Sequence, residues 1–175
     1  MRALPGLEMS TGSLGQGLSP GLGMALGAKR RGLDFRTYVL LGDGELQEGQ
    51  IWEAAFVDSR SGLDNLVAIV DHNGLPQYSW PAAGGEGVLL HQPEIVDRWR
   101  AFGWRALEMD GHDMAEVLHT LRHAHEGAEG RPTGVVAHTV KGKGVSFMEN
   151  QFGWHARPLT GEERRAALRE LEATQ

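Results

Sequence analysis

The sequence predicts an α/β fold, a doubly wound and mostly parallel sheet with helices on both faces. Strand-like and helix-like segments alternate at short intervals along the chain. Residues 36–41 and 66–70 are apolar runs without polar alternation, as in strands covered on both faces. Polar breaks follow both runs directly, at 42–44 and 71–74. Because ligands of such sheets bind outside the carboxyl ends of the strands, these breaks mark the expected functional edge.

Periodicity and turn residues define the helices of the first half. Residues 6–32 are rich in glycine and are expected to form a loop that leads into a helix ending near Gly32. Residues 46–60 are expected to form an amphipathic helix, closed by Ser61 and Gly62, because apolar residues recur at spacings of three and four. Those apolar residues are Ile51, Trp52, Ala55 and Phe56.

The second half continues the alternation after a long irregular segment at 77–91, a length that usually indicates function or mobility. The expected elements are a helix at 93–102, a strand at 104–108, a helix at 113–126, a strand at 133–138, an irregular segment at 141–158 and a helix at 161–173. The helix at 113–126 is expected to have an apolar face formed by Met114, Val117, Leu118 and Leu121. Since no repeat or linker interrupts this order, residues 1–175 are expected to form one domain.

Composition limits the classes of function. The chain has no cysteine, which excludes disulfides, thiolate nucleophiles and cysteine metal sites. Its net charge is −6 and no basic run interleaves with aromatic residues, so a nucleic-acid partner is not expected. No apolar stretch approaches ~20 residues and no signal peptide is visible, so we expect a cytoplasmic protein without a membrane anchor. Glycine accounts for 25 of 175 residues, twice the usual ~7%, which predicts close backbone approach.

The two polar breaks predict a magnesium site. Asp43 and Asn73 follow neighbouring parallel strands, so their side chains are expected to meet at one edge of the sheet. A carboxylate, an amide oxygen and a backbone carbonyl just beyond would suit Mg²⁺, together with diphosphate oxygens. Gly42 and Gly44 would admit the diphosphate, and the helix expected from about Leu46 would point the positive end of its dipole at it.

These segments closely resemble a known family. The run GDGELQEGQIWEAA followed by LDNLVAIVDHNG resembles the thiamine diphosphate motif of transketolases, in the form found in split, two-subunit enzymes. The resemblance extends to STGSLGQGLSPGLGMALGAK, DGHD, TVKGKG and FMENQFGWHARPL, and so covers nearly the whole chain. It implies a thiamine diphosphate-binding fold, with this chain as the domain that binds the diphosphate.

The resemblance implies roles for residues at the sheet edge. Asp43 and Asn73 match the two side-chain ligands of Mg²⁺, and Leu75 matches the residue whose backbone carbonyl completes the set. Gly44 matches a glycine that lies close to the diphosphate, and Gly42 precedes it.

Further roles implied by the resemblance lie outside the strand ends. Gly12, Ser13 and Leu14 match a turn beside the aminopyrimidine, with Ser13 in place of the more common proline. Glu48 matches an acidic residue beside the cofactor at the dimer interface. His155 matches a histidine over the diphosphate and the substrate channel, which makes it the candidate catalytic residue and a further cofactor contact.

The implied activity is transfer of a two-carbon ketol unit from a ketose phosphate to an aldose phosphate, with thiamine diphosphate and Mg²⁺. The family's pyrimidine-binding domain is absent, so the resemblance implies a C-terminal partner subunit within a homodimer or heterotetramer. In the family, a stretch before STGSLGQG supplies further histidines, whereas here nine residues precede Ser10. We therefore expect a shortened N-terminal subunit that is inactive alone.

Several alternatives stay open at this point. The chain could be a catalytically silent cofactor-binding or scaffold fragment, or a relative of deoxyxylulose-phosphate synthase. Glu45 could contact the cofactor as an acid near the metal, or only complement the dipole of the following helix. His119 and His123 are interpreted as solvated surface rather than metal ligands, and Trp99 and Trp104 as core.

Overall fold

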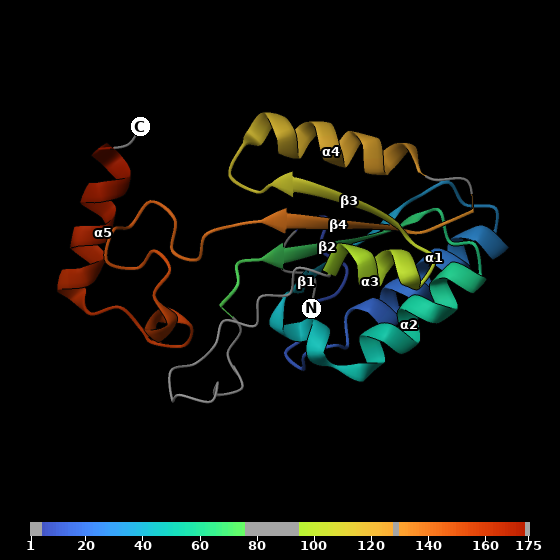
Figure 1. Ribbon diagram of the computed structural model, residues 1–175, viewed down its shortest axis with the longest axis horizontal. Helices are drawn as coiled ribbons and strands as arrows, with labels where there is room; N and C mark the ends of the chain where they lie inside the picture. The colour runs from blue at the N-terminus through green and yellow to red at the C-terminus, as the bar shows by residue number, and fades with distance from the viewer. Residues whose placement is uncertain (1–4, 76–94, 128–129, 174–175) are drawn as a thin grey trace.

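The computed structural model describes residues 5–75, 95–127 and 130–173. At its centre lies a four-stranded parallel sheet with the strand order β1-β2-β4-β3 (Figure 1). The strands are β1 (Thr37–Gly42), β2 (Leu66–His72), β3 (Arg105–Asp110) and β4 (Thr133–His138). Each overlaps a predicted strand, and the predicted α/β class is confirmed. The predicted irregular segment at 77–91 lies outside the described residues.

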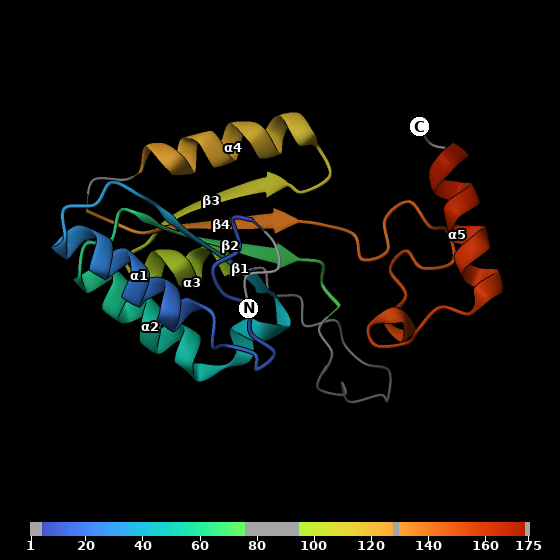
Figure 2. The ribbon, with the colours of Figure 1, turned by 180° about the vertical axis from the view of Figure 1, so that it is seen from behind.

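Helices cover the sheet on both faces, as predicted. Three helices, α1 (Leu18–Arg30), α2 (Gly49–Arg60) and α3 (Ile95–Ala101), lie on one face, and α4 (Met114–Glu126) lies on the other (Figures 1 and 2). The larger core fills the space beneath the three helices; its members include Leu18, Ile51, Leu66, Trp99 and Val136. A smaller core beneath α4 contains Val67, Met109, Ala124, Val135 and Ala137.

The interpretation of the tryptophans as core residues is confirmed. Trp99 and Trp104 are fully buried, with ring centroids 4.6 Å apart. The indole N–H of Trp104 donates to the backbone carbonyl of Ala55 on α2. Gly134 on β4 makes room for Trp99, since a Cβ there would lie 3.1 Å from the indole Cγ. These contacts fix α3 against the sheet.

Strand β1 differs from the prediction that both of its faces are covered. Its burial alternates, with Val39 and Leu41 buried and Tyr38 and Leu40 exposed. Helices α1 and α2 cover the first face, whereas α4 packs over β3, β4 and β2. The His125 ring of α4 reaches β1, with its Nδ1 2.9 Å from the Tyr38 hydroxyl. An apolar run without alternation therefore did not identify the exposed face.

The predicted helix at 46–60 is divided in two. A short 3₁₀ helix, η1 (Gly44–Gln47), is followed by α2, which begins at Gly49. Between them Glu48 is extended, with ψ 125°. The helix that was expected from about Leu46 thus starts as a single 3₁₀ turn, and its dipole is that of this turn. Helix α2 begins further along the chain than predicted. The hydrophobic periodicity was correct, but it cannot locate a break within the first turn.

The apolar face predicted for α4 is also partly wrong. Met114 and Leu118 are exposed, and the buried residues of the helix are Thr120 and Ala124. Val117 packs against the smaller core, as expected. Small residues face the sheet because they let the helix approach closely. The hydrophobic periodicity alone therefore predicted the wrong rotation of α4 about its own axis. The helix begins as expected, with the Asp113 carboxylate accepting from the backbone N–H of Ala115.

The last part of the chain extends beyond the carboxyl ends of the strands. It contains a short 3₁₀ helix, η2 (Phe152–Trp154), and α5 (Gly161–Ala173), which stands apart from the sheet (Figure 1). The Ser146 hydroxyl donates to Glu170 at 2.9 Å, and the Arg157 guanidinium lies 4.0 Å from the centroid of the Trp154 ring. No helix within the described ranges is long and apolar enough to cross a membrane.

Candidate functional site

The ends of β1 and β2 form the edge at which the site was predicted. Gly42 pairs with Asp71 in parallel register. The backbone N–H of Asp43 continues this pairing, because it donates to the Asp71 carbonyl at 3.1 Å. The two polar breaks therefore lie side by side although about thirty positions separate them in the chain.

Asp43 joins the two breaks through its side chain. One carboxylate oxygen, Oδ1, accepts from the backbone N–H of Gly44, and the other, Oδ2, accepts from that of Gly74, both at 2.7 Å. The side chain is buried, with 5% of the residue exposed. The structure joins Asp43 to the Asn73 loop through the backbone N–H of Gly74. That the Asp43 and Asn73 side chains bind one cation stays a prediction.

Asn73 is held by its neighbours. Its amide Nδ2 donates to Asp71 Oδ2 at 3.2 Å, and its Oδ1 accepts from the backbone N–H of Leu75 at 3.1 Å. The other Asp71 oxygen accepts from the Thr139 hydroxyl, which ties this loop to the segment after β4. An amide oxygen has two lone pairs, so Asn73 keeps acceptor capacity for a cation.

His72 is a neighbour of the site that was not among the predicted site residues. Its Nδ1 lies 3.5 Å from Asp43 Oδ2, is buried, and has no hydrogen-bond partner among the described residues. The imidazole also meets His138 edge to face, with ring centroids 5.4 Å apart. The parallel register could have indicated that His72 lies beside Asp43, since the residue after Asp71 must lie beside the residue after Gly42.

Asp43 is suited to remain ionised. Burial raises the pKa of Asp43, but the adjacent His72 ring and the backbone N–H groups of Gly74 and Gly44 outweigh burial and hold the net pKa below its ordinary value. A buried carboxylate that stays charged is a hard oxygen donor, as Mg²⁺ requires. A Cβ added at Gly42 would meet no atom within 4 Å, so the edge also leaves space for a ligand. These residues fit the predicted cation and diphosphate.

The predicted aminopyrimidine turn lies next to this edge. Gly12, Ser13 and Leu14 are exposed, whereas Gly15 is buried. The Glu45 carboxylate accepts from the backbone N–H of Gly15 at 2.7 Å. The structure thus brings the turn together with the strand end.

Two side chains near the start of α2 border this turn. Glu48 is exposed, and its Cβ would lie 2.8 Å from a Cβ added at Gly15. The Gln50 amide donates to the Leu14 carbonyl at 3.3 Å and accepts from the Gln16 amide at 3.0 Å. Glu48 is therefore adjacent to the turn, and its predicted role at a dimer interface stays a prediction.

His155 lies apart from the other candidates. It is exposed, directly follows η2, and its backbone N–H donates to the Phe152 carbonyl. Within the described ranges, no hydrogen bond or ion pair joins its side chain to Asp43, Asn73 or Leu75. The structure places it on the segment beyond the carboxyl ends of the strands, and its catalytic role stays a prediction.

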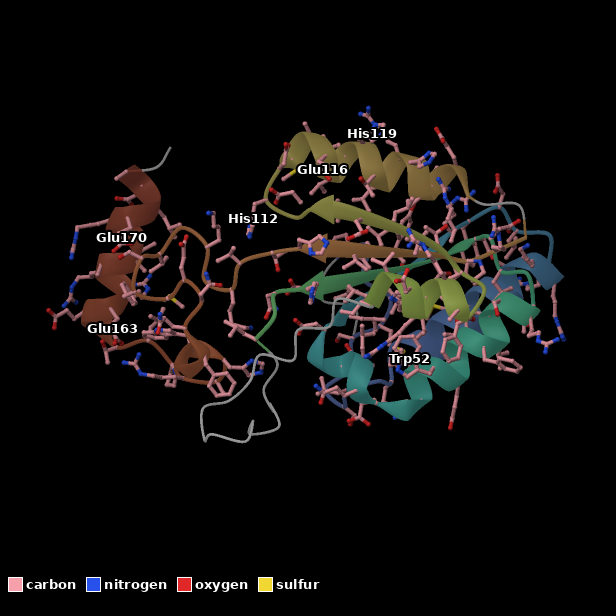
Figure 3. The ribbon with its side chains drawn as sticks, viewed as in Figure 1. Trp52, His112, Glu116, His119, Glu163 and Glu170 are labelled. Atoms are coloured by element: carbon pink, nitrogen blue, oxygen red, sulfur yellow. The ribbon has the colours of Figure 1, made fainter. Side chains whose placement is uncertain are left out.

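The α4 residues His119 and His123 are exposed. The rings of His119 and His123 stack with centroids 6.4 Å apart, and His123 contacts Glu126. His119 projects from the outer side of the helix (Figure 3). In the part of the chain that the structure describes, no group of three or more histidine, aspartate or glutamate side chains could hold a metal ion.

Comparison with known proteins identifies the family. Residues 1–173 match the family described as "Transketolase, thiamine diphosphate binding domain". The chain belongs to the transketolase family. The predicted resemblance is thereby confirmed, and the sheet edge described above belongs to a domain type that binds thiamine diphosphate.

Several curated transketolases are similar in sequence. An apulose-4-phosphate transketolase subunit of Phocaeicola vulgatus is 44% identical over 168 residues, which cover 96% of this chain and 58% of that protein. A 6-deoxy-6-sulfo-D-fructose transketolase subunit of a Clostridium species is 40% identical over 172 residues, covering 98% and 60%. Human transketolase is 44% identical over 154 residues, covering 87% and 23%. The chain thus spans about three fifths of the length of the first two relatives.

The fold is likewise that of a transketolase. The crystal structure of transketolase from Campylobacter jejuni superimposes with a TM-score of 0.82 at 30% sequence identity, covering 95% of this chain and 26% of that one. A transketolase from Pichia stipitis, solved with fructose 6-phosphate, has the same TM-score at 28% identity and covers 97% and 26%. These likenesses show that the chain has the fold of one part of a transketolase.

Proposed function

We propose that this transketolase-family chain binds thiamine diphosphate with Mg²⁺ and, together with a partner subunit, transfers a two-carbon ketol unit between sugar phosphates. The observation that carries the proposal is the hydrogen bond from the Gly74 N–H to Asp43 Oδ2. This bond holds the ionised Asp43 carboxylate beside the Asn73 loop. Together, the carboxylate and the loop offer the oxygen donors that a diphosphate-bound Mg²⁺ requires.

The residues of the edge have distinct tasks in this proposal. Asp43, Asn73 and the backbone carbonyl of Leu75 would hold the cation. Gly42 and Gly44 would leave space for the diphosphate, because neither carries a side chain that would fill the edge. When bound, the cofactor supplies the nucleophilic carbon that carries the two-carbon unit between sugars.

Other residues would act around the reacting sugar. The exposed turn formed by Gly12, Ser13 and Leu14 would border the aminopyrimidine, with Glu48 beside it. His155 would transfer protons to and from sugar hydroxyls, the role that histidines most often take in general acid–base catalysis. Its position on an exposed segment would let it approach a substrate that enters from the carboxyl edge.

A partner subunit completes the proposed enzyme. The names of two relatives designate one subunit of a transketolase, and this chain spans about three fifths of those relatives. We infer that a pyrimidine-side subunit supplies the groups that activate the cofactor, within a homodimer or a heterotetramer. We also place this enzyme in the cytoplasm, in carbohydrate metabolism of the pentose phosphate type.

The decisive experiment combines the chain with its pyrimidine-side subunit. Ketol transfer from xylulose 5-phosphate to ribose 5-phosphate is measured with thiamine diphosphate and Mg²⁺, and the two separate subunits serve as controls. Activity that needs both subunits and both cofactors is the expected result. Cofactor binding by the pair without any ketol transfer from a panel of ketose phosphates would indicate a catalytically silent binding module instead.

A further inference from the structure

Glu45 joins two segments of the site that are distant in sequence. Its Oε1 accepts from the backbone N–H of Gly15 at 2.7 Å, and its Oε2 accepts from the backbone N–H of Gly42 at 3.2 Å. Gly15 belongs to the turn beside the proposed aminopyrimidine position, and Gly42 is the last residue of β1. One carboxylate therefore bridges both sides of the proposed cofactor site.

The bond to Gly42 has a clear structural cause. Along β1, the N–H groups of Thr37 and Asp43 donate to carbonyls before and within β2. In a parallel strand alternate residues point their N–H groups to opposite sides, so the N–H of Gly42 points to the free side of β1. A backbone donor left there would need a partner. The Glu45 carboxylate satisfies it.

The bond to Gly15 holds a tightly packed turn. The Gln16 N–H donates to the Ser13 carbonyl, which closes the turn. Gly15 has a φ of +86°, and a Cβ there would lie 2.8 Å from both Gln50 Nε2 and Glu48 Cβ. The turn is therefore pressed against the start of α2, and only a residue without a side chain fits. Its N–H is free to donate to Glu45 because the turn itself does not use it.

We propose that Glu45 is a positioning residue that fixes the turn at 12–15 relative to the strand end carrying Asp43. This inference rests on the proposed function and deepens it, because it assigns Glu45 the task of setting the spacing between the aminopyrimidine and diphosphate positions. Hydrogen bonds to an ionised acceptor are about twice as strong as neutral ones, which suits a bridge of only two bonds.

This role differs from the two that sequence analysis left open. Both oxygens of Glu45 accept from backbone N–H groups, which hold the carboxylate between the turn and the end of β1. Complementing the helix dipole does not require a contact with the turn around Gly15. The bridge accounts for both contacts.

The first test measures amide hydrogen exchange in the full chain without cofactor. In Glu45→Ala, exchange at Gly15 and Gly42 should become at least tenfold faster, while the Gly74 amide, held by Asp43, keeps its protection. Glu45→Gln retains one acceptor oxygen and should restore protection at one of the two glycines. Glu53→Ala, at an exposed position of α2, is the matched control and should change none of them. Unchanged exchange at Gly15 in Glu45→Ala would overturn the proposal.

The second test uses calorimetry on the chain combined with its partner subunit, with two probes. Glu45→Ala should weaken binding of Mg²⁺–thiamine diphosphate about tenfold, yet leave Mg²⁺–pyrophosphate within twofold, since the Asp43 edge stays intact. Equal weakening of both probes, or of neither, would contradict the positioning role. If the parent pair binds neither probe, the proposed function fails, and the exchange experiment still decides whether Glu45 holds the turn.

Discussion

The Asp43 carboxylate accepts a hydrogen bond from the backbone N–H of Gly74 at 2.7 Å, across 31 positions of the chain. This bond holds the end of β1 against the loop after β2. It orients the buried Asp43 carboxylate toward the Asn73 loop. A site arranged in advance loses less entropy on binding than one that must be assembled.

Substitution of Asp43 should abolish the cation-dependent step of cofactor binding. Asp43→Ala removes the only charged donor proposed for Mg²⁺ and leaves the N–H of Gly74 without its acceptor. We expect Mg²⁺-dependent affinity for thiamine diphosphate to disappear in calorimetry, and stability to fall by about 1–3 kcal/mol in urea unfolding. Asp97→Ala, at an exposed position of α3, is the control. Normal affinity in Asp43→Ala would contradict the metal site.

His155 should matter for turnover more than for binding. In His155→Ala we expect kcat of the assembled enzyme to fall by about 10²–10⁴-fold, the usual contribution of a general acid–base group, while the dissociation constant of thiamine diphosphate changes little. Steady-state kinetics and calorimetry check the two quantities separately. His119→Ala, at an exposed position of α4, serves as the control. Equal rates in His155→Ala and the parent would remove His155 from the catalytic residues.

Asp58 should make the stability of the chain depend on pH. It is fully buried on α2, and neither carboxylate oxygen has a hydrogen-bond partner among the described residues. Burial raises the pKa of Asp58 to about 8 from 3.8. Between these values the folded chain keeps a proton that the unfolded chain releases, so stability falls as pH rises, by up to about 1.4 kcal/mol per pH unit.

The isosteric variant Asp58→Asn isolates this effect, because it cannot ionise. Its free energy of unfolding in urea should exceed that of the parent by a few kcal/mol at pH 8, and the difference should shrink steadily toward pH 4. Asp97→Asn, on the exposed side of α3, should show no such trend. A difference between Asp58→Asn and the parent that is the same at all pH values would contradict the raised pKa.

The exposed face of β1 leads to a stability prediction that differs from one based on side-chain hydrophobicity alone. Leu40 is 73% exposed and Val39 is 8% exposed. Leu40→Ala should therefore change the free energy of unfolding by no more than about 0.5 kcal/mol, whereas Val39→Ala should cost about 1–3 kcal/mol through the cavity it leaves. Urea unfolding of the two variants of this chain measures both. A cost for Leu40→Ala as large as that for Val39→Ala would show that Leu40 is covered.

Much of the candidate site was predictable because its signals are local. Asp43 and Asn73 each follow a recognisable buried strand, and parallel pairing brings such strand ends to one edge. Glu45 shows where local signals end. Its place at the start of a helical segment suggested a dipole partner or an acid, whereas its contact with Gly15 depends on a turn thirty residues away.

The order and type of the elements, the family and the two polar breaks could be predicted from the residues alone. Periodicity and turn chemistry are properties of neighbouring residues, so they can be read along the chain. Three features became visible in the fold alone: the exposed face of β1, the burial of Asp58 without a partner among the described residues, and the bridge from Glu45 to Gly15 and Gly42. Burial and pairing depend on segments that meet in space, and no local pattern encodes which groups will meet.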